Sequence, residues 1–269
     1  MRSRLIGSLL AAATLALASG AMAQESWLEV VHVKAGYVVF MREGSREDRS
    51  TWVVVNQEKL ARVSLLAESG VSDLKPALNK NPRANYLLAL DIRQLTAGSY
   101  VVAVDRAPAS KVWQAPYLNK YLAINSLTDV IRDRAQAQKA ASPARTTISD
   151  YYKAIVQVGN RYSKDVTKPL GQELEIVPLN NPGVDAHGQM GEFQILFKGD
   201  PLVSKEVSVL CRVLNEGQTQ AYQTDQKGRI FFPINQKGVW IVHTAYAHTS
   251  EDNSYDWKIY ESTLTFTTR

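Results

Sequence analysis

The sequence predicts a mainly β protein with three parts: an N-terminal antiparallel β-domain, a short helical connector and a C-terminal seven-stranded β-sandwich of immunoglobulin- or transthyretin-like shape. Two observations lead to this prediction. Short segments rich in β-branched and aromatic residues recur over most of the chain, separated by Gly, Pro, Asn or charged clusters. Helical spacing of apolar residues appears only between residues 126 and 158. We therefore expect domains at residues 24–115, 116–168 and 169–269.

Six strand-like segments predict the N-terminal domain. They span residues 26–34, 37–42, 51–56, 61–66, 86–90 and 99–105. Polar and apolar residues alternate in these segments, which indicates an antiparallel sheet with one face in water.

Two helices are expected in the connector. Ser126 can begin the first, because Asp129 follows three places later, where the helix dipole favours a negative charge. Pro143 then marks a stop. The second helix is expected over residues 148–158, where apolar side chains at positions i, i+3, i+4 and i+7 would form one stripe. The stripe consists of Ile148, Tyr151, Tyr152 and Ile155.

Seven further segments predict the C-terminal sandwich. They span residues 174–179, 192–197, 205–214, 219–224, 229–233, 239–247 and 257–267. Turn-forming sequences such as Asn181-Pro182-Gly183 separate them. Strands of this length and spacing are typical of a β-sandwich.

The first 23 residues have the pattern of a secretory signal. A basic start is followed by an apolar run of Leu and Ala, and small residues stand at Ala21 and Ala23. We expect cleavage after Ala23 and a periplasmic mature chain with no membrane span, because the apolar run is short for a bilayer of about 30 Å. The formal charge of +5 is scattered, with no basic stripe that would indicate a nucleic-acid partner.

The chain shows none of the common catalytic motifs. There is no G-x-S-x-G elbow, no H-E-x-x-H helix and no glycine-rich phosphate loop. Cys211, the single cysteine, lies in an apolar strand-like run, where a buried, inert thiol is expected. We therefore expect a protein that is not an enzyme.

Several stretches from about residue 148 to the end resemble one known family. They include residues 150–159, 171–182 and 256–266, the turn Phe197-Lys198-Gly199-Asp200-Pro201-Leu202 and the hairpin Thr224-Asp225-Gln226-Lys227-Gly228. In this order they resemble the family called domain of unknown function 4198. The resemblance implies an exported protein of nickel or cobalt uptake, with a membrane metal transporter or another envelope protein as its partner.

Proteins of the family that this chain resembles commonly begin their mature chain with an A-H-x-x-W-L-x-P pattern. The histidine of that pattern can bind a divalent metal. Here Gln24 stands in the place of that histidine, and an amide is a poor ligand for nickel.

The remaining candidate metal ligands are His248, His243, His187 and Asp185. The resemblance favours His248, because the family often has a histidine near this position. His243 and His248 lie five residues apart on one predicted strand, so they would point to opposite faces unless a bulge intervenes. Asp185 and His187 could offer an oxygen and a nitrogen to a metal, or form an ordinary turn.

The predicted function is a non-enzymatic periplasmic binding protein that handles a divalent metal such as nickel or cobalt. The alternative is a protein- or glycan-binding module without metal, which would use strand edges or aromatic residues. Trp52, Trp113 and Trp257 are candidates for that role, although isolated tryptophans usually pack in the core.

Overall fold

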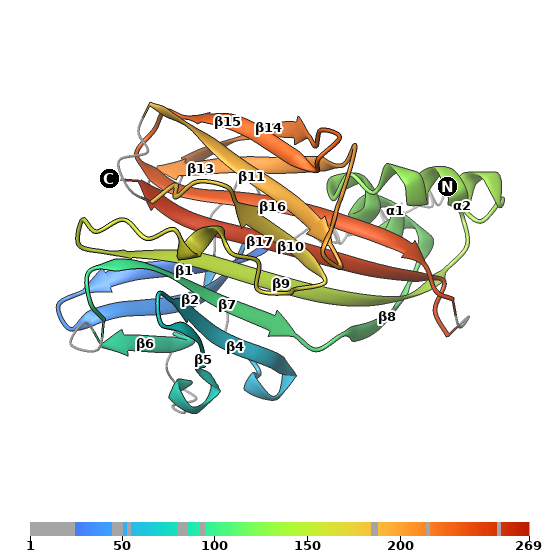
Figure 1. Ribbon diagram of the computed structural model, residues 1–269. Coiled ribbons are helices and arrows are strands. Elements are labelled where there is room, and N and C mark those ends of the chain that lie inside the picture. Colours follow the sequence, from blue (N-terminus) through green and yellow to red (C-terminus); the bar gives the residue numbers. More distant parts are fainter. Residues whose placement is uncertain are drawn as a thin grey trace, which may run out of the picture.

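The computed structural model describes residues 25–44, 51–52, 55–79, 86–91, 95–183, 188–213, 216–251 and 254–268. Within these residues the protein is mainly β, with three sheets and two α-helices (Figure 1). Short 3₁₀ turns occupy Gln57–Lys59, Lys75–Ala77 and Asp165–Thr167. Neither α-helix is long and apolar enough to cross a membrane.

The central layer is a nine-stranded sheet in the order β14-β13-β16-β17-β9-β7-β4-β5, with β8 paired to β9. Its strands are β4 (Leu60–Ala67), β5 (Gly70–Asp73), β7 (Gly98–Arg106), β8 (Ala109–Trp113), β9 (Ala144–Val158), β13 (Glu206–Val213), β14 (Glu216–Gln223), β16 (Gly238–Thr249) and β17 (Trp257–Thr268). The pair β17·β9 is parallel, whereas the other pairs of this sheet are antiparallel. Strand β9 therefore joins the C-terminal strands to the N-terminal ones.

A smaller sheet covers one face of the C-terminal strands and completes the predicted sandwich. It consists of β10 (Leu174–Pro178), β11 (Gln189–Phe197), β12 (Asp200–Pro201) and β15 (Arg229–Ile234). Stacked aromatic rings fill the space between the two layers, among them Phe193, Phe232, Trp240 and Phe266. All seven predicted strands are present, and β12 is a two-residue addition. Cys211 is buried in this core, as expected.

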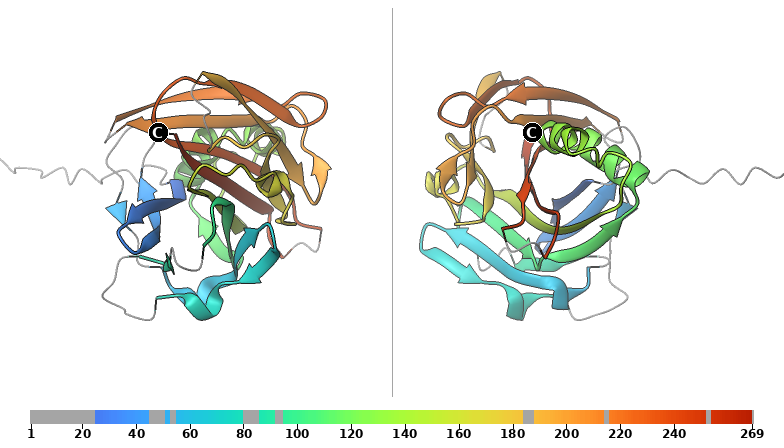
Figure 2. Two further views of the ribbon diagram at one scale, coloured as in Figure 1. Left: turned by 60° about the vertical axis from the view of Figure 1, so that its left-hand side comes forward. Right: turned by 90° about the vertical axis from the view of Figure 1, so that its right-hand side faces the viewer.

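Two separate elements cover the other face of the central sheet. The third sheet, made of β1 (Glu25–Val33), β2 (Gly36–Gly44), β3 (Thr51–Trp52) and β6 (Leu88–Asp91), packs on β4, β7 and β9 around a second apolar core. Helices α1 (Ala115–Ile124) and α2 (Thr128–Gln136) cover the end near β8 and pack on Trp113, Trp257 and Ile259. Figure 2 shows the helices and β1–β2 on the same side of the curved central sheet.

The predicted helix over residues 148–158 is wrong, because this segment is part of β9. Strand β9 is buried on both faces: Tyr151 and Ile155 contact the sandwich core, and Tyr152 contacts the N-terminal core. A strand covered on both sides loses the polar–apolar alternation that identifies a strand, so its apolar residues can match a helical stripe by chance. The β-branched and aromatic composition was the better guide.

The first predicted helix is real but begins later, at Thr128. Ser126 does not cap it, since the Ser126 hydroxyl donates a hydrogen bond of 2.5 Å to Glu206 instead. Helix α1 was not predicted. The central sheet also takes strands from all three predicted domains, so the expected boundaries do not separate independent sheets.

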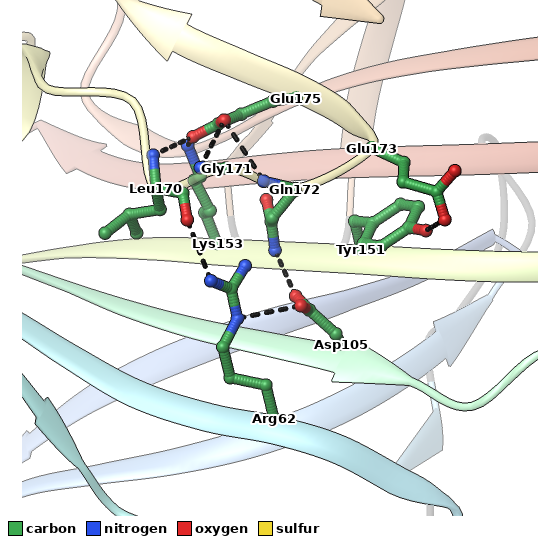
Figure 3. Close-up of polar contacts among 9 residues, drawn as sticks. All are labelled: Arg62, Asp105, Tyr151, Lys153, Leu170, Gly171, Gln172, Glu173 and Glu175. Atoms are coloured by element: carbon green, nitrogen blue, oxygen red, sulfur yellow. Dashed lines mark hydrogen bonds and ion pairs between the residues drawn. The ribbon is translucent and has the colours of Figure 1, made fainter. Parts of the chain in front are cut away.

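A buried ion pair ties β9 to the covering sheet of the sandwich (Figure 3). Lys153 on β9 donates to Glu175 on β10 and, at 3.1 Å, to the carbonyl of Ile176. The side chains of Lys153 and Glu175 are only 3% and 2% exposed. The Glu175 carboxylate also accepts the backbone N–H groups of Gly171 at 2.9 Å and Gln172 at 3.2 Å. Burial lowers the pKa of Lys153, against the opposing effect of Glu175.

This network extends to the N-terminal strands. Gln172 donates to Asp105 on β7 at 2.6 Å, and Arg62 on β4 donates to Asp105 at 2.8 Å and to the Leu170 carbonyl at 2.8 Å. The segment before β10 is therefore held to three consecutive strands of the central sheet, β9, β7 and β4. We assign this network a structural role, because its central charges are closed off from solvent.

We expect Lys153→Met to lower the free energy of unfolding by about 3–5 kcal/mol, because the charge of Glu175 then stays buried without its cation. The double variant Lys153→Met/Glu175→Gln should recover at least about 1 kcal/mol of that loss, since the buried charge is gone while an amide oxygen still accepts the backbone N–H groups. Urea unfolding followed by tryptophan fluorescence measures both values. Arg161→Met, which breaks an exposed ion pair with Glu68, is the control and should cost less than about 1 kcal/mol. A double variant less stable than Lys153→Met would contradict this account.

Candidate functional site

The predicted ligands His243 and His248 lie on opposite faces of β16. His248 faces the sandwich side, where its ring stacks on Tyr260 with 5.6 Å between centroids. Its Nδ1 lies 2.7 Å from the Thr249 carbonyl oxygen, and its Nε2 lies 3.3 Å from the Tyr260 hydroxyl. His243 is buried on the other face, with Nε2 3.6 Å from a carboxylate oxygen of Glu261. The two histidines therefore cannot hold one metal ion together.

The other predicted ligands, Asp185 and His187, lie outside the described residues, as does Gln24. Among the residues that are described, no three His, Cys, Asp or Glu side chains gather in a way that could hold a metal ion. The tryptophans of the alternative function are buried: Trp113 and Trp257 are each 8% exposed. The side chain of Trp52 is outside the described part of the chain.

A pocket opens where the two covers of the central sheet meet, between α1 and the third sheet. We call it the α1 pocket; its volume is about 360 Å³. The central sheet contributes Asp150, Tyr152 and Glu261, and the end of β7 contributes Arg106. We call the part of the lining formed by Trp113 from β8 and by Tyr117 and Tyr121 from α1 the aromatic side of the pocket. Glu43, Lys111 and Lys120 complete the charged part of the lining.

Two carboxylates from neighbouring strands form the polar side of the α1 pocket. Asp150 on β9 lies directly opposite Glu261 in the parallel register of β17, so both side chains point to the same face. Each side chain is 18% exposed. Arg106 Nη1 lies 3.2 Å from Asp150 Oδ2, and the Tyr121 hydroxyl donates a hydrogen bond to Glu261. The pair is thus held by the protein but remains open to the pocket.

The surroundings of these carboxylates shift their pKa values in opposite directions. Burial raises the pKa of Asp150 to about 7, and the negative charge of Glu261 adds to this, against the effect of Arg106. Burial also opposes ionisation of Glu261, but His243 and the Tyr121 hydroxyl hold the pKa of Glu261 below its usual value. The proton that the pair takes up near neutral pH therefore lies mainly on Asp150, which is about half ionised at pH 7.

The sequence alone does not reveal this pair. Asp150 falls in the first turn of the helix predicted over residues 148–158, and no motif surrounds Glu261. The available signal was a single acidic residue in a strand-like segment rich in apolar and hydroxyl-bearing residues, at Asp150 and again at Glu261. That both lie at one register position could not be seen before β9 and β17 were known to pair.

Comparisons with known proteins identify a family but no activity. A family model described as Domain of unknown function (DUF4198) matches residues 15–248. No curated protein matches the chain. Solved structures that match include dimeric latent PorU from Porphyromonas gingivalis, at 8% identity and a TM-score of 0.17. That match covers 91% of this chain and 20% of the PorU chain, so the present chain spans about a fifth of that protein, and the likeness supports no argument about fold or function.

We expect Asp150 to make the free energy of unfolding depend on pH. Because its folded pKa is raised, the stability that it contributes is present below about pH 4 and is lost as the pH rises through about 7. The free energy of unfolding of Asp150→Asn, relative to that of the wild type, should therefore rise by on the order of 2–4 kcal/mol between pH 4 and pH 8. Urea unfolding at several pH values measures this difference. Asp133→Asn, an exposed change on α2, is the control, and its difference in unfolding free energy from the wild type should not change over this pH range. Parallel pH curves for Asp150→Asn and the wild type would rule out the shift.

Proposed function

The chain belongs to the family described as domain of unknown function DUF4198, and from this premise we propose that it is a non-enzymatic binding protein that holds a small ligand in the α1 pocket. The observation that supports this proposal is the pocket itself. Its volume of about 360 Å³ lies within the usual range of ligand sites. It also combines an aromatic side with a few converging polar groups, as such sites do.

The polar groups of the α1 pocket are suited to orient a ligand. The Glu261 carboxylate is fixed by Tyr121 and faced by His243, while Asp150 is fixed by Arg106. Side chains held in this way meet a ligand without first losing conformational freedom, which favours affinity. A ligand can therefore bind without rearrangement of these side chains. The proposal requires binding alone and no chemical reaction.

The cell envelope is the place that we propose for this binding. The support is the signal pattern of the first 23 residues, with cleavage after Ala23 and release into the periplasm. Another envelope protein or a membrane transporter is then the partner that would receive the ligand.

We expect Tyr117→Ala to weaken ligand binding, because Tyr117 is 56% exposed at the pocket and can be truncated without disturbing the core. Saturation-transfer NMR with a panel of cationic, neutral and anionic small molecules provides the measurement. Tyr162→Ala is the matched control, since Tyr162 is 48% exposed and does not line the pocket. At least one chemical class should lose about tenfold in affinity only in Tyr117→Ala. Equal binding by both variants, or no binding at all, would refute the pocket function.

The nickel or cobalt function stays a prediction from the family resemblance and has its own test. It predicts that the mature protein binds nickel, cobalt, copper or zinc with a dissociation constant below about 10 μM, and that His248→Ala weakens this binding. Isothermal titration calorimetry with each metal alone provides the measurement. If none of the four metals binds this tightly, the metal function is wrong.

A further inference from the structure

We propose that the ligand of the α1 pocket is an aliphatic primary amine, whose ammonium group contacts Asp150 and Glu261 and whose carbon chain lies against the aromatic side. This inference rests on the proposed function and names the chemical class of its ligand. It is supported by the charge of one side of the pocket and by an ammonium group that already lies against the other.

The lining of the α1 pocket has three acidic and three basic side chains, but the charged groups that act on Asp150 are more negative than positive. Glu43, Asp150 and Glu261 all line the pocket, and the guanidinium of Arg106 lies 3.2 Å from Asp150. His243 faces Glu261 from within the sheet. An ammonium group between Asp150 and Glu261 can donate charge-assisted hydrogen bonds to both carboxylates, which are among the stronger hydrogen bonds in proteins. A cationic ligand would therefore balance the charge around Asp150.

The aromatic side of the pocket already holds an ammonium group of the chain itself. The Nζ atom of Lys111 lies 3.4 Å from the centroid of the Trp113 ring, and the Tyr121 ring lies 4.9 Å from that ring. Partial burial lowers the pKa of Lys111. A cation over an aromatic ring is stabilised by the ring's electrons, most strongly by tryptophan. The same surface can accept the alkylammonium of a ligand, and Lys111 then competes with that ligand.

Other classes of ligand fit the pocket less well. A metal ion would leave most of a 360 Å³ volume unused. A neutral alcohol would hydrogen-bond to the carboxylates but leave their charge unbalanced. An anion would meet Lys111 and Lys120, but also the three carboxylates.

Amine binding should depend on the ionisation of Asp150. The groups that face Asp150 come from seven elements: Glu43 on β2, Arg106 on β7, Lys111 on β8, Tyr121 on α1, Tyr152 on β9, His243 on β16 and Glu261 on β17. Because the pKa of Asp150 lies at about 7, its ionised fraction rises about tenfold between pH 6 and pH 8. The amine should bind correspondingly more tightly at pH 8.

The test is isothermal titration calorimetry of the full mature chain with putrescine, its neutral analogue 1,4-butanediol, and succinate. Putrescine should bind at least about 100-fold more tightly than either of the others, and about tenfold more tightly at pH 8 than at pH 6. Asp150→Asn should weaken putrescine binding at least about tenfold at pH 8 and remove its dependence on pH. Lys111→Met should tighten putrescine binding several-fold. Lys120→Met should have a smaller effect, because it removes an equal charge that does not lie over the Trp113 ring.

The inference is overturned if butanediol or succinate binds as tightly as putrescine, or if Asp150→Asn folds and leaves putrescine binding unchanged. If Asp150→Asn does not fold, Lys111→Met decides, because Lys111 is exposed on an edge strand and its replacement leaves the core intact. If putrescine does not bind, but a neutral or anionic ligand binds and Tyr117→Ala weakens that binding, the amine inference is wrong and the proposed function stands. If no binding depends on Tyr117, both are wrong.

Discussion

The ion pair between Lys153 and Glu175 joins the layers of this protein at their centre. Strand β9 carries Lys153 toward the sandwich, and the carboxylate of Glu175 gathers the backbone of residues 170–172 around it. Because both side chains are almost fully buried, neither charge can be left alone without a large cost. The pair therefore constrains where β10 begins and how the segment before it crosses β4 and β7.

The other face of the same strand makes the candidate site. Successive residues of a strand point to opposite faces, so Asp150 and Tyr152 face the helices and the third sheet while Lys153 faces the sandwich. The two covers on that side come from different parts of the chain and meet over β9 and β17. The α1 pocket lies in this gap, and its carboxylates Asp150 and Glu261 lie on the neighbouring strands β9 and β17 of the central sheet.

The α1 pocket combines carboxylates held within the central sheet with side chains exposed at the edge of the fold. Asp150 and Glu261 are held in register by the parallel pair β9·β17, whereas Lys111 and Tyr117 are exposed on an edge strand and a helix. Burial of Asp150 in this setting, together with the negative charge of Glu261, raises the pKa of Asp150 to about 7. The binding that we propose and the uptake of a proton would therefore involve the same carboxylate.

The amino-acid sequence by itself determined the mainly β character, the seven strands of the sandwich and the family, because turn residues and β-branched segments are local signals. It could also place His243 and His248 on opposite faces, since the alternation of a strand is local too. It could not determine that residues 148–158 form a strand, because burial on both faces removes the alternation. Only the tertiary structure decided that Asp150 and Glu261 share one register position, more than a hundred residues apart in the chain, because strand pairing depends on long-range packing.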